Sequence, residues 1–300
     1  MATIEQTKVR FDSGGVACVG YVYHSVLGAG QVPCVVVGTG FTGTQDTPSI
    51  QAVAEAFAEA GFAALTFDYR HFGESEGVPR QLVRIKGQQE DFHAAIRCAR
   101  GQAGTDPERV ALWGTSLGGG HVIAVAADDP RIAAVVAQVP FNGFPKRVEG
   151  RSTRATIRLL GAMIEDTVRG WLGLAPAYIR AVGQTGELAV MASSEARQTI
   201  DSMQSNYWRN EVAPRALFEM MSYKPSARAR RLGMPVLVCI AEHDRESPAE
   251  LARQMADNAP RGELKNYPFT HFDFYRPDLR ALIVGDQVDF LRKHLMVKRQ

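Results

Sequence analysis

Short apolar runs alternate with stretches of helical periodicity between residues 32 and 139. The apolar runs lie at 32–37, 62–67, 109–113 and 132–139. The helical patterns lie at 48–60, 87–100 and 118–127. Strands that are continuously apolar are covered on both faces, which is typical of a parallel sheet between two layers of helices. The alternation therefore predicts an α/β fold with a mostly parallel sheet flanked by helices.

Further segments extend this sheet at both ends of the chain. Residues 9–22 alternate between apolar and polar around the turn SGG, which predicts an antiparallel hairpin. The strand pattern returns at 235–240, followed by a helix near 248–258, a short strand at 263–267 and a last helix at 278–295. We therefore expect one core domain built from residues 1–140 and 231–300.

Residues 141–230 interrupt the rhythm of strands and helices. Their pattern is helical, without a convincing strand, and they contain several methionine and aromatic residues. We expect a helical cap, or lid, inserted into the core domain. The methionine and aromatic side chains suggest an apolar pocket, although this spacing is also typical of residues that form the interior of the cap.

Composition excludes several other classes of protein. Hydrophobic residues make up 45% of the 300 residues, charged residues 22%, and the net charge is +2, so nothing favours nucleic-acid binding. The first 15 residues lack a basic stretch followed by an apolar one, and no apolar run approaches the ~20 residues that span a bilayer. The four cysteines form neither a CxxC pair nor a metal-ligand spacing, and we expect no metal. We expect a soluble, cytoplasmic protein without a membrane partner.

The sequence GTSLG at residues 114–118 lies between a predicted strand and a predicted helix. Small residues on both sides of Ser116 permit a turn so tight that the serine backbone is strained and its hydroxyl stands clear of the sheet. The positive end of the following helix would favour a nearby oxyanion. The pattern alone also fits an ordinary glycine-rich turn, but its strand–turn–helix context predicts a nucleophilic serine.

A nucleophilic serine needs a base and an acid that orients it, in the chain order serine, acid, histidine for this type of fold. His271 follows the last predicted strand, where the base belongs. Asp244 follows the strand at 235–240 and is the favoured acid, with Glu242 and Glu246 as rivals. Asp244 has an alternative reading as the cap of the helix that begins near residue 248.

Backbone amides are expected to form the oxyanion hole. The amide of Leu117 directly follows the nucleophile, and a second donor should come from the turn after the first parallel strand. Phe41 is the favoured second donor and Thr42 the alternative.

The same turn, GTGFTG at residues 38–43, matches the dinucleotide fingerprint GxGxxG. Asp68 ends the next strand, roughly where a ribose-binding acid would lie. However, a hairpin precedes this strand, and a dinucleotide fold has no use for a strained serine turn matched by a late histidine. We therefore expect no cofactor. Residues 68–75 are read as a loop held by local hydrogen bonds rather than as part of a ligand site.

With these residues, the sequence resembles the α/β-hydrolase superfamily over essentially its whole length, and most of all its dienelactone-hydrolase-like and Xaa-Pro-peptidase-like esterases. Residues 67–75 resemble the family loop DxRGxGxS, with His71 in place of the usual glycine, and GTGF at 38–41 stands where many members have His-Gly. The resemblance implies an eight-stranded sheet, a cap between strands six and seven, and no cofactor.

These residues predict a serine hydrolase that cleaves a carboxylic ester, or a related acyl compound, with Ser116, Asp244 and His271 as a triad. Its partner would be a small acyl substrate, and the sequence leaves open whether the protein forms a homodimer. A biosynthetic thioesterase, cyclase or transacylase and an amide hydrolase are alternatives on the same fold. A member that binds a ligand without catalysis is a third hypothesis, which an intact triad disfavours.

Overall fold

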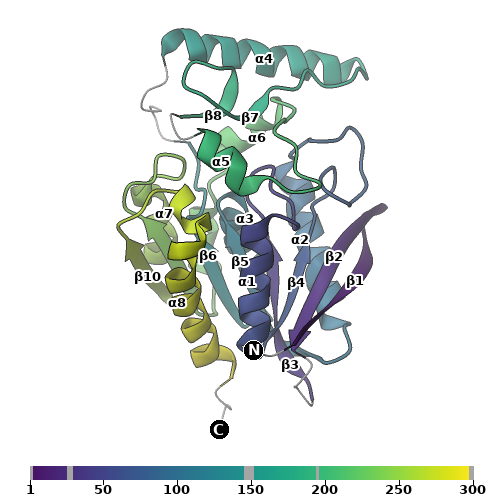
Figure 1. Ribbon diagram of the computed structural model, residues 1–300, viewed down its shortest axis with the longest axis vertical. Coiled ribbons are helices and arrows are strands. Elements are labelled where there is room, and N and C mark those ends of the chain that lie inside the picture. Colours follow the sequence, from purple (N-terminus) through teal and green to yellow (C-terminus); the bar gives the residue numbers. More distant parts are fainter. Residues whose placement is uncertain (1–2, 26–29, 145–151, 194–195, 297–300) are drawn as a thin grey trace.

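Eight strands form one twisted sheet at the centre of the molecule, shown in Figure 1. The computed structural model describes residues 3–25, 30–144, 152–193 and 196–296. The sheet consists of β1 (Ile4–Ser13), β2 (Val16–Ser25), β3 (Val32–Gly38), β4 (Ala63–Phe67), β5 (Thr105–Thr115), β6 (Ala134–Gln138), β9 (Val236–Ala241) and β10 (Gly262–Tyr267). Their order is β1-β2-β4-β3-β5-β6-β9-β10, and every neighbouring pair is parallel except β1–β2 and β2–β4. The predicted hairpin and the mostly parallel sheet are confirmed.

Helices cover both faces of this sheet because its central strands are apolar on both sides. Successive side chains of a strand point to opposite faces, and β3 shows this directly: Cys34 and Val36 belong to one buried cluster, Val35 and Val37 to the other. The first cluster includes residues of α2 (Ile85–Arg100), α3 (Leu117–Ala126) and α7 (Ala249–Asn258). The second includes residues of α1 (Pro48–Glu59) and α8 (Pro277–Leu295), which lie in front of the sheet in Figure 1.

The segment between β6 and β9 contains α4 (Thr153–Trp171), α5 (Ala196–Met203), α6 (Ala216–Ser222) and the 3-10 helix η1 (Pro225–Arg231). Its helices α4, α5 and α6 lie beyond the carboxyl ends of the parallel strands, at the top of Figure 1, whereas η1 packs against α3 and α7 beside the sheet. The segment also contains β7 (Arg180–Gly183) and β8 (Ala189–Ala192), which pair in parallel. The expectation of an insertion without strands is therefore wrong, because strands of four residues are too short to show an alternating pattern. We call residues 152–231 the cap segment.

Polar contacts at two places hold the cap segment in shape and against the core. Within it, the fully buried Asp166 of α4 accepts hydrogen bonds from the backbone amides of Ala177 and Arg215, at 2.9 and 3.1 Å. Towards the core, Asp46 accepts from the Ser205 hydroxyl at 2.8 Å and from the Tyr207 amide at 3.1 Å. The cap segment is thus anchored beside the turn that follows β3.

Candidate active site

Ser116 occupies the junction between β5 and α3 in a strained conformation. Its φ of 54° and ψ of −119° are rare for a residue with a side chain, and such strain persists only where the surroundings enforce it. Glycines enforce it here, because a Cβ on Gly114 would collide with the carbonyl of Gly118, and one on Gly118 with the carbonyl of Thr39. The predicted tight turn is therefore present, and it directs the serine side chain away from the sheet interior.

His271 and Asp244 are brought together from loops after β10 and β9. The Nδ1 atom of His271 lies 2.8 Å from Oδ2 of Asp244, and their side chains are only 4% and 1% exposed. The other carboxylate oxygen, Oδ1, accepts hydrogen bonds from the amides of Glu246 and Ser247, at 2.8 and 2.7 Å. Asp244 is therefore the hydrogen-bond partner of the imidazole, whereas the alternative role as helix cap is wrong, because the N-cap of α7 is Pro248 and no side chain caps it.

The rival carboxylates do not take this position. Glu242 is exposed on the surface. Glu246 raises the pKa of His271 through its charge. Since the backbone after β9 directs only Asp244 toward the imidazole, the structure favours Asp244 as the orienting acid.

The charge environment of His271 favours its protonated form. Burial lowers the pKa of this imidazole, but the charge and hydrogen bond of Asp244 raise it, and the charge of Glu246 raises it further. The net result is a pKa above the usual value of 6.5. Because a base with a higher pKa holds a proton more strongly, this environment stabilises the imidazolium that forms when the histidine accepts a proton.

Ser116 and His271 line the same small cavity, of about 40 Å³, together with Gly40, Phe41 and Met191. The backbone at Gly40 passes so close that a Cβ there would lie 3.1 Å from the Cβ of Ser116. Leu117 is the first residue of α3, so its amide has no acceptor within the helix. The turn after β3 and the start of α3 therefore both border the space in front of the serine hydroxyl, as the oxyanion-hole prediction requires.

A chain of buried polar side chains, which the sequence did not reveal, links the serine turn to the histidine loop. The histidine loop continues into the 3-10 helix η2 (Phe272–Tyr275). The hydroxyl of Tyr275 lies 2.9 Å from that of Thr115, which accepts a hydrogen bond of 3.2 Å from Gln138. Gln287 donates to Gln138 at 2.8 Å. Burial raises the pKa of Tyr275, so its hydroxyl stays protonated. We interpret these contacts as fixing both loops relative to each other.

A larger apolar cavity of about 330 Å³ lies between the cap segment and the core. Its apolar lining comes from Phe144, Leu159, Leu160, Met163, Val190, Met191, Leu217 and Met221. Arg245 and Glu246, which directly follow the orienting Asp244, also line it. Met191 lines this cavity and the small one at Ser116, so the two cavities meet at this side chain.

The features that suggested a dinucleotide site have local structural explanations. A Cβ on Gly38 would collide with the ring of Phe92. The carboxylate of Asp68 is fully buried and accepts hydrogen bonds from the amides of Gln45 and Glu74, both at 2.9 Å. Burial raises the pKa of Asp68 to about 6. Asp68 therefore ties the turn after β3 to its own loop.

His71, which replaces the usual glycine of that loop, keeps the backbone conformation that a glycine would adopt. Its φ is 73°, in the left-handed region. Its amide donates to the carbonyl of Glu76 at 2.7 Å, and its carbonyl accepts from Gln81 at 2.9 Å. These two hydrogen bonds hold His71 in the left-handed backbone conformation that a glycine adopts easily.

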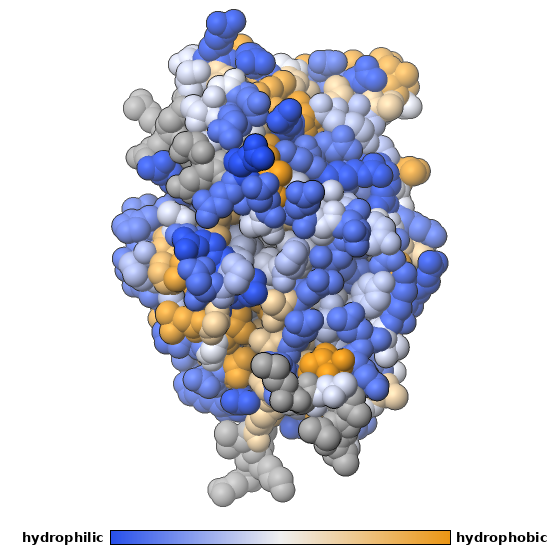
Figure 2. Space-filling model, in the orientation of Figure 1, coloured by the Kyte–Doolittle hydropathy of each residue, from blue (hydrophilic) through white to orange (hydrophobic). Residues whose placement is uncertain are grey.

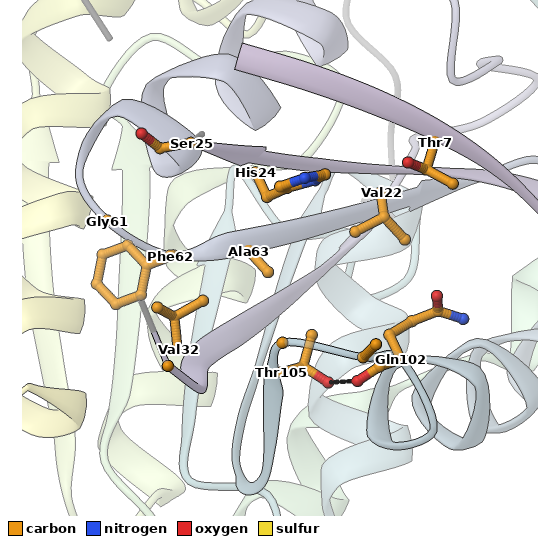
Figure 3. A pocket seen from close by; sticks show the side chains of 13 residues that line it. Thr7, Val22, His24, Ser25, Val32, Gly61, Phe62, Ala63, Gln102 and Thr105 are labelled. Atoms are coloured by element: carbon orange, nitrogen blue, oxygen red, sulfur yellow. Dashed lines mark hydrogen bonds between the residues drawn. The ribbon is translucent and has the colours of Figure 1, made fainter. Parts of the chain in front are cut away.

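A separate cavity of about 530 Å³, shown in Figure 3, lies away from these residues. It is lined by residues at the amino ends of β3, β4 and β5, including Val32, Ala63 and Thr105, whereas Ser116 follows the carboxyl end of β5. Among the described residues that line it, His24 is the one titratable residue, and it lies near Glu5 of the neighbouring strand. This cavity therefore has no part in the chemistry of Ser116.

Within the described part of the chain, no group of three or more His, Cys, Asp or Glu side chains is arranged to hold a metal ion. None of the helices in those residues combines the length and the apolar character that crossing a membrane requires.

Comparisons with known proteins agree with this architecture. A family model described as "Serine aminopeptidase, S33" matches residues 34–271. The quorum-quenching protein AidA of Acinetobacter baumannii is 37% identical over 293 residues, which cover 97% of this chain and 95% of the relative. Thiohydrolase apmlB of Arthrinium phaeospermum is 28% identical over 303 residues, with 96% of both chains covered.

A solved structure shows the same fold. The α/β hydrolase GrgF from Penicillium sp. sh18 superposes with a TM-score of 0.79 at 21% identity, over 97% of this chain and 99% of that one. At this identity the likeness supports the fold alone. The extent of the family match, from β3 to His271, and the 37% identical relative establish the family. The chain belongs to the family described as "Serine aminopeptidase, S33", and is thus an enzyme of the α/β-hydrolase superfamily.

Proposed function

We propose that this protein is a serine hydrolase that cleaves esters of apolar acids through an acyl-enzyme on Ser116. The observation that carries the proposal is the strained serine, which shares a cavity with a histidine hydrogen-bonded to a buried aspartate. A catalytic serine needs this set of groups, since a hydroxyl is a weak nucleophile until a neighbouring base removes its proton.

In the proposed reaction, His271 takes the proton of Ser116 while Oγ attacks the substrate carbonyl. The tetrahedral intermediate collapses when the bond to the leaving alcohol breaks and His271 gives its proton to that alcohol. Water, deprotonated by His271, then attacks the acyl-enzyme, and the acid leaves as the serine regains its proton. Asp244 holds the imidazole with Nε2 free to accept and stabilises the imidazolium.

The amides of Leu117 and Phe41 are the proposed oxyanion donors. Leu117 contributes an unsatisfied helix amide, and Phe41 lies in the turn that borders Ser116. Donors placed beforehand at the developing negative charge are often the largest contribution to catalysis of acyl transfer.

The acyl group is proposed to occupy the 330 Å³ cavity beside Met191, whose lining is mostly aliphatic and methionine side chains. Ligand cavities start at about this size, and each buried methylene contributes roughly 0.8 kcal/mol. This supports esters of medium-length acids as the first choice. Thioesters follow, because one relative is named a thiohydrolase, and amides come after them.

The rate of hydrolysis of p-nitrophenyl esters tests this proposal. Across a series from acetate to longer acids, kcat/KM should rise by up to about fourfold per methylene until the cavity is filled. Ser116→Ala should lose nearly all activity at every chain length while its circular dichroism spectrum is unchanged. Unchanged esterase activity in that variant would refute the role of Ser116, and a flat or falling series would refute the apolar acyl site.

A thioesterase, cyclase or transacylase on the same residues is the second candidate. It is favoured by the relative named a thiohydrolase, since a carrier-bound thioester gives the same acyl-enzyme and a hydroxyl can replace water as acceptor. Two measurements distinguish them. A higher kcat/KM for an acyl thioester than for the ester of the same acid supports the thioesterase, and transfer of the acyl group to an added alcohol supports the transacylase. Faster release of the free acid from the ester supports the first proposal.

A further inference from the structure

The hydroxyl of Thr47 is buried without a hydrogen-bond partner beside the nucleophile. Thr47 is only 5% exposed, and it lines the small cavity that Ser116 and His271 share. Within the described part of the chain, no atom bonds to its Oγ1. Burying a hydroxyl without a partner is unfavourable, and such groups are uncommon in folded proteins. A molecule that enters this cavity can supply the missing partner.

The position of Thr47 in the chain makes the free hydroxyl more unusual. Thr47 is the N-cap of α1, where a threonine side chain ordinarily accepts a hydrogen bond from an amide of the first turn. Its side chain makes no such bond. The amides of Ile50 and Gln51 donate instead to the backbone carbonyl of Thr47, at 2.9 and 3.1 Å. The hydroxyl therefore serves neither the helix nor a neighbouring side chain.

The surroundings of this hydroxyl favour a neutral oxygen acceptor. α1 has 12 residues and no acidic residue in its first turn, so the positive end of its dipole attracts an electron-rich group. Ser49, which belongs to that turn, is also buried and lines the cavity. The carboxylate of Asp46 directly precedes Thr47 and holds the hydroxyl of Ser205, and its negative charge disfavours an anion. A carbonyl oxygen satisfies both conditions.

The size and place of the small cavity indicate which part of a substrate lies there. The larger cavity beyond Met191 is assigned to the acyl chain, which leaves the small one for the alcohol that departs. Its 40 Å³ holds roughly three water-sized groups. In Figure 1 α5 lies above the N-terminal end of α1, against which it packs, and Figure 2 shows mainly hydrophilic residues over this part of the surface. A short polar alcohol suits this side of the site.

Given the proposed acyl-enzyme on Ser116, on which this step rests, we propose that Thr47 selects esters whose alcohol carries a neutral carbonyl oxygen close to the ester bond. The Thr47 hydroxyl donates a hydrogen bond to that oxygen while Ser116 attacks the acyl carbon. When the bond to the alcohol breaks, the alcohol takes its proton from His271 and leaves with its carbonyl group intact. Simple alkyl esters leave the Thr47 hydroxyl without a partner and are poorer substrates.

Two hexanoate esters with leaving groups of equal size test the proposal. In acetonyl hexanoate, a carbonyl oxygen takes the place of one methyl group of isobutyl hexanoate. The two alcohols differ in intrinsic reactivity, so the quantity compared between variants is the ratio of the two kcat/KM values. Thr47→Val keeps the shape of the side chain without its hydroxyl and should lower this ratio by about threefold to tenfold, the effect of one neutral hydrogen bond. Thr47→Ser keeps the hydroxyl and should stay within about twofold.

Thr199→Val is the matched control. Thr199 is 1% exposed and its hydroxyl is likewise buried without a partner, but it lies on α5 and does not line the cavity. This variant should leave the ratio unchanged. Urea titration separates a lost contact from a lost fold: the unfolding midpoint of Thr47→Val should not fall, because the substitution removes no hydrogen bond of the folded chain.

A ratio that Thr47→Val leaves unchanged, or a loss that both esters share equally, overturns the proposal. A higher kcat/KM for carboxymethyl hexanoate than for acetonyl hexanoate would assign the small cavity to an anion, and would also overturn it. Hydrolysis of p-nitrophenyl hexanoate without hydrolysis of acetonyl hexanoate would refute the role of Thr47 alone. Failure to hydrolyse any of these esters would refute the proposed function itself.

Discussion

Replacing Asp244 by asparagine tests how the acid acts on the histidine. The amides of Glu246 and Ser247 both donate to Oδ1, at 2.8 and 2.7 Å, so the oxygen of the asparagine side chain should take this position. Its NH₂ group then faces Nδ1 of His271, where Oδ2 now lies at 2.8 Å. An NH₂ donor at Nδ1 requires that nitrogen to accept, which moves the ring proton to Nε2, the atom that must accept the proton of Ser116.

The expected cost of Asp244→Asn is the loss of the correct tautomer and of the charge that stabilises the imidazolium. In serine proteases this change costs about 10⁴ in kcat, which at 1.36 kcal/mol per tenfold is roughly 5.4 kcal/mol of barrier. Initial rates with the best p-nitrophenyl ester measure it. Glu242→Gln, on the exposed neighbour, should stay within about twofold, because it does not touch the imidazole. A rate of Asp244→Asn within about tenfold of the unmodified protein would refute the tautomer argument.

Other predictions concern pH, the serine turn and the acyl cavity. Because the pKa of His271 is raised and only the neutral ring accepts a proton, kcat/KM should fall as pH drops through a midpoint above 6.5. Glu246→Gln removes a charge that raises this pKa, so it should move the midpoint to lower pH. A midpoint that stays in place or rises in this variant contradicts the electrostatic explanation. Gly118→Ala should lower the free energy of unfolding by at least about 2 kcal/mol in urea titrations, since its Cβ would strike backbone carbonyls. Gly285→Ala, whose Cβ meets nothing within 4 Å in a helix, should raise it by up to about 1 kcal/mol; equal effects of the two changes would refute the steric account. Met191→Trp should reduce kcat/KM for long-chain esters at least about tenfold more than for acetate, because this side chain separates the two cavities; equal losses for both would show that the long chain does not pass it.

The order of strands and helices could be predicted because buried strands and amphipathic helices have different periods. The cap segment is where this reasoning failed. β7 and β8 are too short to alternate visibly, and they pair in parallel, with Arg180 opposite Ala189, although parallel strands usually need a much longer connection. The apolar spacing of α4 was correctly read as helical, but periodicity does not say what a helical face touches. Met163 of that pattern is buried, whereas Ile157 and Ile164 are exposed.

The candidate site could be predicted in position but not in detail. Ser116 and His271 follow from the chain order of the fold, since both must lie beyond the carboxyl ends of parallel strands. The choice of Asp244 over its neighbouring glutamates depends on how the backbone turns after β9, which no local pattern records. The contact between Thr115 and Tyr275 joins residues 160 positions apart, and single polar residues in a strand and a loop give no signal of it.

The measurement that tests the central claim most directly is covalent labelling with a fluorophosphonate, followed by mass spectrometry of the digested protein. This reagent reacts with serines that a base activates. We predict one adduct per chain, on the peptide that contains Ser116. We also predict that the adduct is absent in Ser116→Ala and forms much more slowly in Asp244→Asn, because the base is then held in the wrong tautomer. A protein that stays unlabelled, or that is labelled equally after Ser116→Ala, would contradict the assignment of Ser116 as the nucleophile.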